Sequence, residues 1–154
     1  MYKSIPGYPD YMINEYGEVC SIKNSKVKIL KQSDDGDGYY KISLFKDKKV
    51  YCKKVHRLLG ITFLNCSNDM QIDHIDGDRS NNSLSNLRIV TSQENHFNRT
   101  TAKGCHFYKP TNRWMAYIVL NKKKIHLGYF DTEEDAHAAY LKAKEIYHVI
   151  EVRS

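Results

Sequence analysis

The segment "QIDHIDGDRSNNSLSNLRIVTSQENH", residues 71–96, contains the clearest structural pattern in the central part of this chain. It opens with a short apolar strand pattern around Ile72 and continues into a loop of Asp, Gly, Asn and Ser, whose side chains bond to local backbone. The run "LRIV" predicts a second strand, after which Thr91 or Ser92 can cap a helix with Glu94 near its third position. The predicted order is strand, loop, strand and helix.

The same stretch carries residue types that suit the cleavage of a phosphodiester. Asp73 is a hard oxygen ligand for Mg²⁺ or Mn²⁺, and the imidazole of His74, with an unperturbed pKa of about 6.5, can accept a proton at neutral pH. Because neighbours on a strand point to opposite faces, one side chain can serve a metal and the other a water. The predicted helix can bring Asn95 back as a second ligand, and Asn86 can bond backbone across the hairpin. By composition and spacing alone, such a pattern is more often an ordinary polar surface.

The length and composition limit the class of protein. A chain of 154 residues with 41% hydrophobic content corresponds to one ordinary domain or to two or three very small modules. No apolar run approaches the ~18 residues that a membrane span needs. The opening "MYKSIPGYPDYM" has no apolar signal core, so we expect a soluble, intracellular protein.

The cysteines favour neither a zinc site nor disulfides. Cys20, Cys52, Cys66 and Cys105 stand far apart and form no C-x-x-C pair, which structural zinc sites usually contain. Disulfides are also rare in a reducing compartment. We therefore expect reduced thiols that pack mostly as small apolar groups.

The distribution of charge points to a polyanionic partner. The formal net charge is +6, and the segment from Lys103 to Phe130 contains six Lys or Arg and no Asp or Glu. A second basic cluster runs from Lys46 to Arg57 and is interrupted only by Asp47. Solvated faces usually mix both signs, and neutralising phosphates releases counterions. These segments therefore predict a surface that faces phosphates.

Short strands and one helix are predicted before residue 71. "IPGYPDYMINEYGEVCSI" (5–22) is rich in Tyr, Gly and Pro and contains short β-like pieces around a turn at Gly17. Residues 39–45 and 50–55 predict a hairpin. "HRLLGITFL" (56–64) has apolar residues near helical spacing and predicts a short helix.

A sheet and a helix are predicted in the last third of the chain. "GCHFYKPTNRWMAYIVLNKKKIHLGYF" (104–130) reads as three strands, and Asp131 or Thr132 would cap a helix that runs through Tyr147. An apolar stripe on that helix predicts packing against the sheet and comprises Ala136, Ala139, Tyr140, Ala143, Ile146 and Tyr147. The whole chain is therefore predicted to be an α+β protein.

The segments "VHRLLGITFL" and "QIDHIDGDRSNNSLSNLRIVTSQENH" together resemble the HNH endonuclease family with the ββα-metal fold. The branch is the one found among phage and intron-encoded homing endonucleases. The family's first His matches His74, its central Asn matches Asn86, and its third position, often His, matches Asn95.

This resemblance implies roles for the central residues. His74 and Asn86 would be catalytic, and Asp73 with Asn95 would hold one divalent cation per site, Mg²⁺ or Mn²⁺. Because His96 and Asn98 stand near Asn95 on the same predicted helix, they stay open as alternatives for the helix ligand.

Resemblances extend to both flanks. "IPGYPDYMINEYGEVCS" is similar to the NUMOD4-like module with which members of this branch begin, and "KGCHFYKPTNRWMAYIVLNKKKIHLGYFDTEEDAHAAYLKA" resembles the AP2 DNA-binding domain, a three-stranded sheet packed on one helix. The implied organisation is a β module over residues 1–45, a nuclease core over 46–100 and a DNA-binding domain over 101–154.

The expected DNA contacts combine these resemblances with the basic segments, and they are Lys53, Lys54, Arg57, Arg113, Trp114, Lys122, Lys124 and His126. Arg113 suits a guanine edge, which an Arg can grip with two hydrogen bonds, whereas the lysines suit phosphates. Trp114 equally suits a core position, because its strand is apolar on both faces.

The resulting hypothesis is a homing-type endonuclease that hydrolyses phosphodiesters of double-stranded DNA and nicks one strand per monomer. The alternative is a sequence-specific DNA-binding regulator that kept the fold and lost catalysis. We expect a monomer with no small-molecule cofactor and no membrane contact. We also expect it to be phage-encoded and to act in the cytoplasm of the bacterial host.

Overall fold

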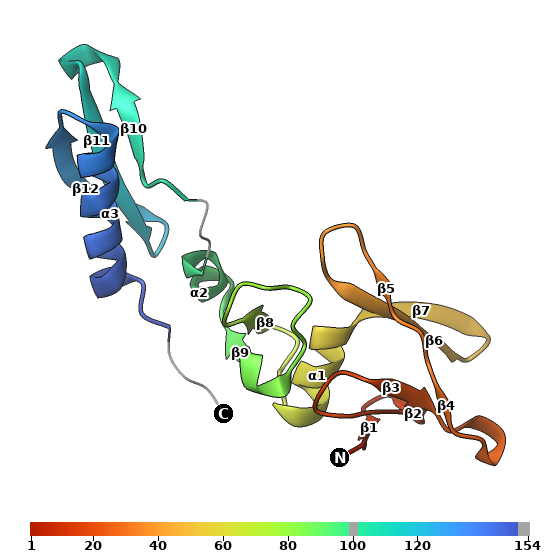
Figure 1. The fold of residues 1–154 in the computed structure, drawn as a ribbon. Helices are drawn as coiled ribbons and strands as arrows, with labels where there is room; N and C mark the ends of the chain where they lie inside the picture. The colour runs from red at the N-terminus through yellow and green to blue at the C-terminus, as the bar shows by residue number, and fades with distance from the viewer. Residues whose placement is uncertain (99–101, 151–154) are drawn as a thin grey trace. The chain divides into compact units, whose positions relative to one another are not determined.

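The structure is a computed structural model that describes residues 1–98 and 102–150 (Figure 1). The chain is α+β, as predicted, with several small antiparallel sheets and few helices. The described residues divide into two units, the first comprising residues 1–92 and the second comprising residues from Gln93 to 150.

The first unit begins with a four-stranded antiparallel sheet. Its strands follow chain order, namely β1 (Lys3–Ile5), β2 (Tyr8–Ile13), β3 (Val19–Ser21) and β4 (Lys28–Ile29), with the 3₁₀ turn η1 (Lys23–Ser25) before β4. Gly17, in the turn between β2 and β3, has a φ of +83°. A Cβ there would lie 2.9 Å from Cγ1 of Val55, so this turn needs glycine for both its conformation and its close contact.

A second sheet and a helix follow. The strands are β5 (Ser33–Asp34), β6 (Tyr40–Lys46) and β7 (Lys49–Lys54), and the helix is α1 (Val55–Phe63). The β6–β7 turn consists of Asp47 and Lys48, both with positive φ, as in the two-residue turns that match the twist of a hairpin. The predicted hairpin and the predicted helix are therefore confirmed.

The quoted stretch of residues 71–96 folds in the predicted order. Strand β8 (Gln71–His74) pairs with β9 (Leu87–Val90), and the 3₁₀ turn η2 (Leu84–Asn86) and helix α2 (Ser92–Phe97) precede and follow β9. A Cβ at Gly60 of α1 would lie 2.4 Å from Cγ1 of Ile72. Glycine at this position lets α1 approach β8 closely and so positions the strand that ends in the Asp-His pair.

One core joins all the sheets of the first unit. Its buried members come from every part of the unit and are Ile5, Tyr11, Ile13, Val19, Ile42, Leu44, Val55, Leu58, Leu59, Cys66, Ile72, Leu87 and Ile89. Burying such side chains stabilises the fold by roughly 1.5–3 kcal/mol each relative to exposure. The β8–β9 hairpin is too small to be stable alone, so this shared core supports it.

The second unit contains an antiparallel sheet with one helix across it (Figure 1). The strands are β10 (Cys105–Tyr108), β11 (Arg113–Leu120) and β12 (Lys123–Phe130), with the 3₁₀ turn η3 (Lys109–Thr111) before β11, and the helix is α3 (Glu133–Tyr147). The side chain of Thr132 caps α3 by accepting a hydrogen bond from the backbone N–H of Asp135 at 3.1 Å. Of the two predicted caps, Thr132 is therefore the one used.

The apolar stripe of α3 is shorter than predicted. Ala136, Tyr140 and Ala143 are buried, and Tyr140 and Ala143 pack in a cluster with Ile118 of β11. Ile146 and Tyr147 are 69% and 40% exposed, so the prediction was wrong for the last turn. The sheet residues of this cluster, Ile118, Ile125 and Leu127, meet the helix only as far as Ala143.

Two further expectations can be compared with the structure. No helix in the described part of the chain is long and apolar enough to cross a membrane. All the cysteines are free thiols; Cys20 and Cys66 are buried, as expected for small apolar groups, whereas Cys52 is exposed.

Candidate active site and nucleic-acid interface

Asp73 and His74 end strand β8 and are both buried, with exposed fractions of 7% and 4%. Asp73 lies opposite Arg88 in the β8–β9 register. Arg88 donates from Nε at 2.9 Å and from Nη2 at 2.7 Å to the same carboxylate oxygen, Oδ2 of Asp73. A buried carboxylate is costly without such a partner. Arg88 was not predicted from the sequence, because its contact with Asp73 depends on the strand register.

Asn82 orients the imidazole of His74. Nε2 of His74 lies 3.2 Å from Oδ1 of Asn82, and the Asn82 amide nitrogen donates to the backbone oxygen of Ser80 at 3.4 Å. Because this second bond turns the amide oxygen toward the ring, Oδ1 of Asn82 is placed to accept a hydrogen bond from Nε2 of His74 when that nitrogen carries the proton. Asn82 was not predicted, and the only signal for it was its place in the Asn-rich loop.

A second buried imidazole lies beside the first. The ring centroids of His56 and His74 are 5.1 Å apart. The ring centroid of Tyr39 lies 4.9 Å from that of His56. Burial, followed by the nearby His74, Lys54 and Arg57, lowers the pKa of His56 to about 3. Nδ1 of His56 has no hydrogen-bond partner among the residues that the structure describes. His56 therefore packs as an uncharged ring inside the unit and is not accessible at its surface.

Asn86 closes the loop between the two strands. Its amide nitrogen donates to Oδ1 of Asp76 and to the backbone oxygen of Asn81, both at 2.9 Å, and its Oδ1 accepts from the backbone N–H of Asp76 at 3.2 Å. The backbone N–H of Ile75 also donates to the oxygen of Asn86 at 2.8 Å. Hydrogen bonds from Asn86 and then Asn81 hold the pKa of Asp76 below its ordinary value. Asn86 thus fixes the geometry of the loop that follows His74.

The predicted helix ligand is on α2, which belongs with the second unit. Asn95 is half-buried and His96 exposed, while Asn98 directly follows the helix. Phe97 of the same helix stacks on His148, with ring centroids 4.0 Å apart. The approach of Asn95, or of its alternatives, to Asp73 stays a prediction.

The donor atoms suit a hard divalent cation. Within residues 1–98 and 102–150, no group of three or more His, Cys, Asp or Glu could hold a metal. A site built on the carboxylate of Asp73 and one amide oxygen would instead leave most coordination positions to water, as Mg²⁺ prefers. The residues present therefore fit Mg²⁺ or Mn²⁺ better than zinc, which needs several nitrogen or sulfur ligands.

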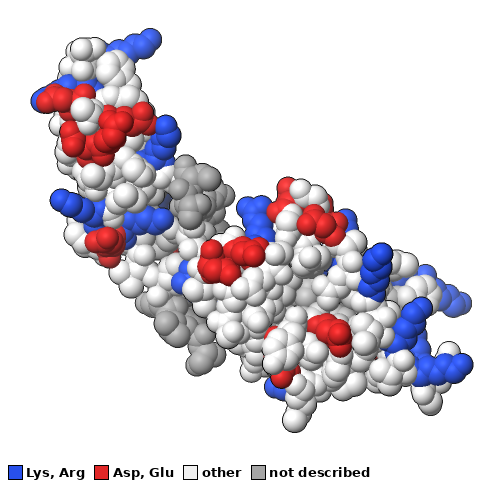
Figure 2. Space-filling view, viewed as in Figure 1, with Lys and Arg blue, Asp and Glu red and all other residues white. Residues whose placement is uncertain are grey.

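The predicted DNA contacts of the first unit differ in accessibility. Lys53 is exposed, while Lys54 is half-buried, pairs with Asp35 at 2.9 Å and lies 3.8 Å from the ring centroid of Tyr39. Arg57 donates to the backbone oxygen of Met70 at 2.9 Å and so holds the chain between α1 and β8. Figure 2 shows further Lys and Arg gathered at the end of this unit that carries β4 and the β6–β7 hairpin.

The sheet of the second unit has one face covered by α3 and one polar, aromatic face. The face opposite α3 carries His106, Arg113, Tyr117, Lys124, His126 and Tyr129, which the strand registers place side by side. Lys124 lies 4.2 Å from the ring centroid of Tyr117, and Arg113 pairs with Asp131 at 2.8 Å. Exposed cations among aromatic rings are suited to contact with nucleic acid.

Trp114 lies apart from these residues. Alternation along β11 places Trp114 on the same face as Ala116 and Ile118, and it packs edge-on against Phe107 at 5.6 Å. Its half-buried position supports the packing role considered for it. Lys122 is exposed in the β11–β12 turn.

Two family models match the chain. Residues 53–97 match HNH endonuclease, and residues 2–45 match the NUMOD4 motif. The first match contains α1, the Asp73–His74 pair, Asn82 and Asn86. The second ends within β6.

Phage proteins are among the chain's relatives. It is 41% identical over 105 residues to DNA endonuclease I-HmuI of Bacillus phage SP01, covering 65% of this chain and 59% of that protein. It is 33% identical over 106 residues to H-N-H endonuclease F-TflII of Escherichia phage T5, covering 67% and 54%. The chain thus spans little more than half the length of these curated relatives.

A solved structure is also similar. It is described as DNA binding and cleavage by the HNH homing endonuclease I-HmuI, and it matches with a TM-score of 0.56 and 41% sequence identity. The match covers 64% of this chain and 56% of the other. The architecture of the matched part is therefore shared with a homing endonuclease.

Proposed function

We propose that this protein is a homing-type DNA endonuclease that hydrolyses phosphodiester bonds of double-stranded DNA with a divalent cation. The observation that carries the proposal is the buried Asp73–His74 pair, with Nε2 of His74 held by Asn82, inside the segment that matches HNH endonuclease. The named relatives that cleave DNA support it.

In the proposed reaction His74 is the general base. Its Nδ1 lone pair takes a proton from a water that attacks phosphorus, while Asn82 holds the protonated Nε2 and so keeps the ring in the required orientation. Asn86 fixes the loop that follows. Asp73 and Asn95 would hold Mg²⁺ or Mn²⁺, which supplies positive charge to the phosphoryl and departing oxygens.

The second unit would deliver the site to DNA as an AP2-like module. The polar face of its sheet would enter the major groove, as β-sheet readers do, with Arg113 at a base edge once it releases Asp131. Lys122 and Lys124 would hold phosphates. Lys53 and Lys54 would contact backbone beside the catalytic hairpin.

The proposed setting is a bacterial host cell infected by a phage that encodes the protein. The phage relatives support this origin. The protein would act as a monomer in the cytoplasm and nick one strand per active site.

The test is nicking of supercoiled plasmid during a titration with Mg²⁺ or Mn²⁺, with DNA affinity measured in parallel. His74→Ala should lose nicking by on the order of 10²-fold or more while it binds DNA and metal nearly normally. Wild-type nicking by His74→Ala at pH 8 would show that the base is another residue. A wild-type protein that binds DNA without nicking under any metal would instead be a regulator.

The same titration tests the helix ligand. Asn95→Ala should need more Mn²⁺ than wild type, since a water can replace one neutral ligand. Asn95→His should keep activity with Mn²⁺, for which imidazole is a serviceable ligand. If Asn95→Ala matches wild type at every metal concentration, His96 and Asn98 become the residues to test.

A further inference from the structure

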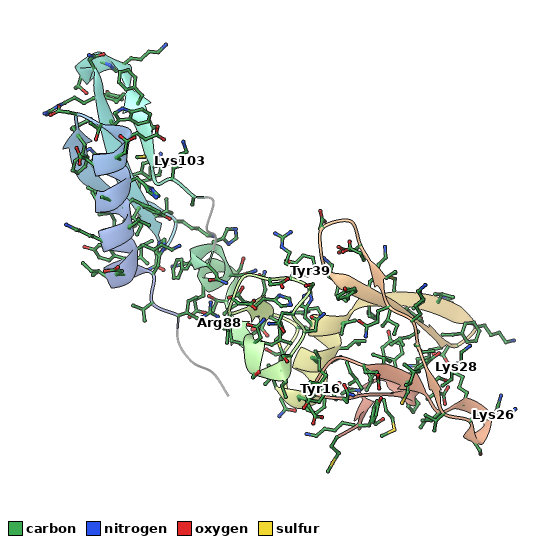
Figure 3. The ribbon with its side chains drawn as sticks, viewed as in Figure 1. Tyr16, Lys26, Lys28, Tyr39, Arg88 and Lys103 are labelled. Carbon is green, nitrogen blue, oxygen red and sulfur yellow. The ribbon has the colours of Figure 1, made fainter. Side chains whose placement is uncertain are left out.

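The ion pair between Arg88 and Asp73 is largely buried and lies within the β8–β9 hairpin. Nε and Nη2 of Arg88 both donate to Oδ2 of Asp73, and the side chains of Arg88 and Asp73 are only 24% and 9% exposed. Arg88 is labelled in Figure 3. The pair spans directly opposite positions of β8 and β9, so the register of the hairpin fixes it. Its carboxylate is the one that the proposed function assigns to a cation.

A permanent cation beside a metal ligand has two opposing effects. The guanidinium repels the incoming divalent ion and so weakens its binding. It also compensates the buried carboxylate whenever the metal is absent, which matters because an unpaired buried charge is strongly destabilising. An ion pair that served only to stabilise the fold would not need to include Asp73, the proposed metal ligand.

We propose that Arg88 is a positioning residue for the metal ligand. It occupies Oδ2 of Asp73, turns the other carboxylate oxygen toward the cation, and neutralises Asp73 until the cation arrives. The inference rests on the proposed function, because it requires Asp73 to be a ligand. Arg88 would thus lower the affinity of the site for the cation. It would also keep the metal-free site stable and Asp73 correctly oriented.

The geometry of Arg88 makes two substitutions informative. Arg88→Gln keeps a hydrogen-bond donor but removes the charge, whereas Arg88→Lys keeps the charge but removes the pair of nitrogens that meet one oxygen. If the charge opposes the metal, only Arg88→Gln should bind Mn²⁺ more tightly. If the paired nitrogens orient the carboxylate, both variants should nick more slowly at saturating Mn²⁺.

The experiment is calorimetric titration of the full chain with MnCl₂, together with thermal unfolding with and without MnCl₂. Arg88→Gln should bind Mn²⁺ about 10-fold more tightly than wild type, because the repulsion is lost. It should melt at a lower temperature than wild type without metal, and Mn²⁺ should raise its melting temperature more than it raises that of wild type. Arg88→Lys should bind Mn²⁺ within about 3-fold of wild type.

Lys103→Gln is the matched control, because it removes an exposed ion pair, that of Lys103 with Glu133. It should change neither Mn²⁺ affinity nor the effect of Mn²⁺ on unfolding. Unchanged or weaker Mn²⁺ binding by Arg88→Gln would overturn the inference and leave the proposed function intact. Wild-type protein that binds no Mn²⁺ and no Mg²⁺ would overturn both, and that outcome is visible without any variant.

Discussion

The two units use their residues differently. In the first unit, strands from three sheets and α1 bury one continuous core, and the polar groups buried beside it are those of the candidate site, Asp73, His74, His56 and Asn82. In the second unit, a small cluster around Ile118 holds one helix to one face of a sheet, and the opposite face exposes cations and aromatic rings.

The two units therefore meet different structural requirements, namely fixed side-chain positions in the first and accessible side chains in the second. A base and a metal ligand must be kept in place to within a fraction of an ångström, which requires packed neighbours on every side. A surface that meets DNA needs accessible groups in a fixed spacing, which a short sheet backed by one helix supplies. Substitutions and truncations in the two units are therefore expected to affect different properties.

The largest effect is expected from removing the sheet and helix α3 of the second unit. A fragment of residues 1–100 should bind DNA about 100-fold more weakly than the whole chain, with a shallower salt dependence because fewer phosphates are neutralised. Affinity measured by fluorescence anisotropy over a range of salt concentrations tests this. The whole chain carrying His74→Ala is the control and should bind as wild type does. Equal affinity and equal salt slope for fragment and whole chain would remove the second unit as a DNA-binding module.

A smaller effect is expected from acid on the first unit. Because the folded pKa of His56, about 3, lies below its ordinary 6.5, its contribution to stability is present above pH 6.5 and is lost as pH falls toward 3. Between pH 7 and pH 5 this amounts to about 2 kcal/mol. His56→Phe should therefore lose less unfolding free energy over that range than wild type.

Denaturant unfolding at the two pH values measures this difference. His106→Phe, which replaces an exposed imidazole, is the matched control and should keep the wild-type loss. The same loss for wild type and His56→Phe would mean that His56 is not buried in its uncharged form.

The smallest effect concerns the helix of the second unit. Thr132→Ala removes the cap of α3 and should lower the stability of that unit by about 1 kcal/mol. Amide hydrogen exchange should then speed up in α3 and not in β8. Thr111→Ala, a matched threonine outside the helix, should leave α3 unchanged. Faster exchange in both units would show that they unfold together.

Local patterns were sufficient to predict most of the fold. The strands around Ile72 and Ile89, the hairpin turn at Asp47, and α3 all follow from periodicity and turn chemistry. The last turn of α3 was mispredicted because Ile146 and Tyr147 have the right spacing but lie beyond the residues that could cover them.

The candidate site was less predictable from the sequence. Asp73, His74 and Asn86 were identified through their pattern, whereas Arg88, Asn82 and His56 were not assigned to it. Arg88 meets Asp73 through strand register, and His56 meets His74 through the packing of α1 on β8. Such contacts depend on tertiary structure and leave no local signal.

The shared core of the first unit limits how chimeras can be built from this chain. Ile5 and Val19 lie in the same core as Ile72 and Ile89, so a crossover near residue 45 would split one hydrophobic interior between two parents. A crossover at Ser92, where the two units divide, would leave that interior whole and exchange the second unit together with α2. Recombination can therefore exchange the second unit, the proposed DNA-binding part, more readily than it can replace the N-terminal strands.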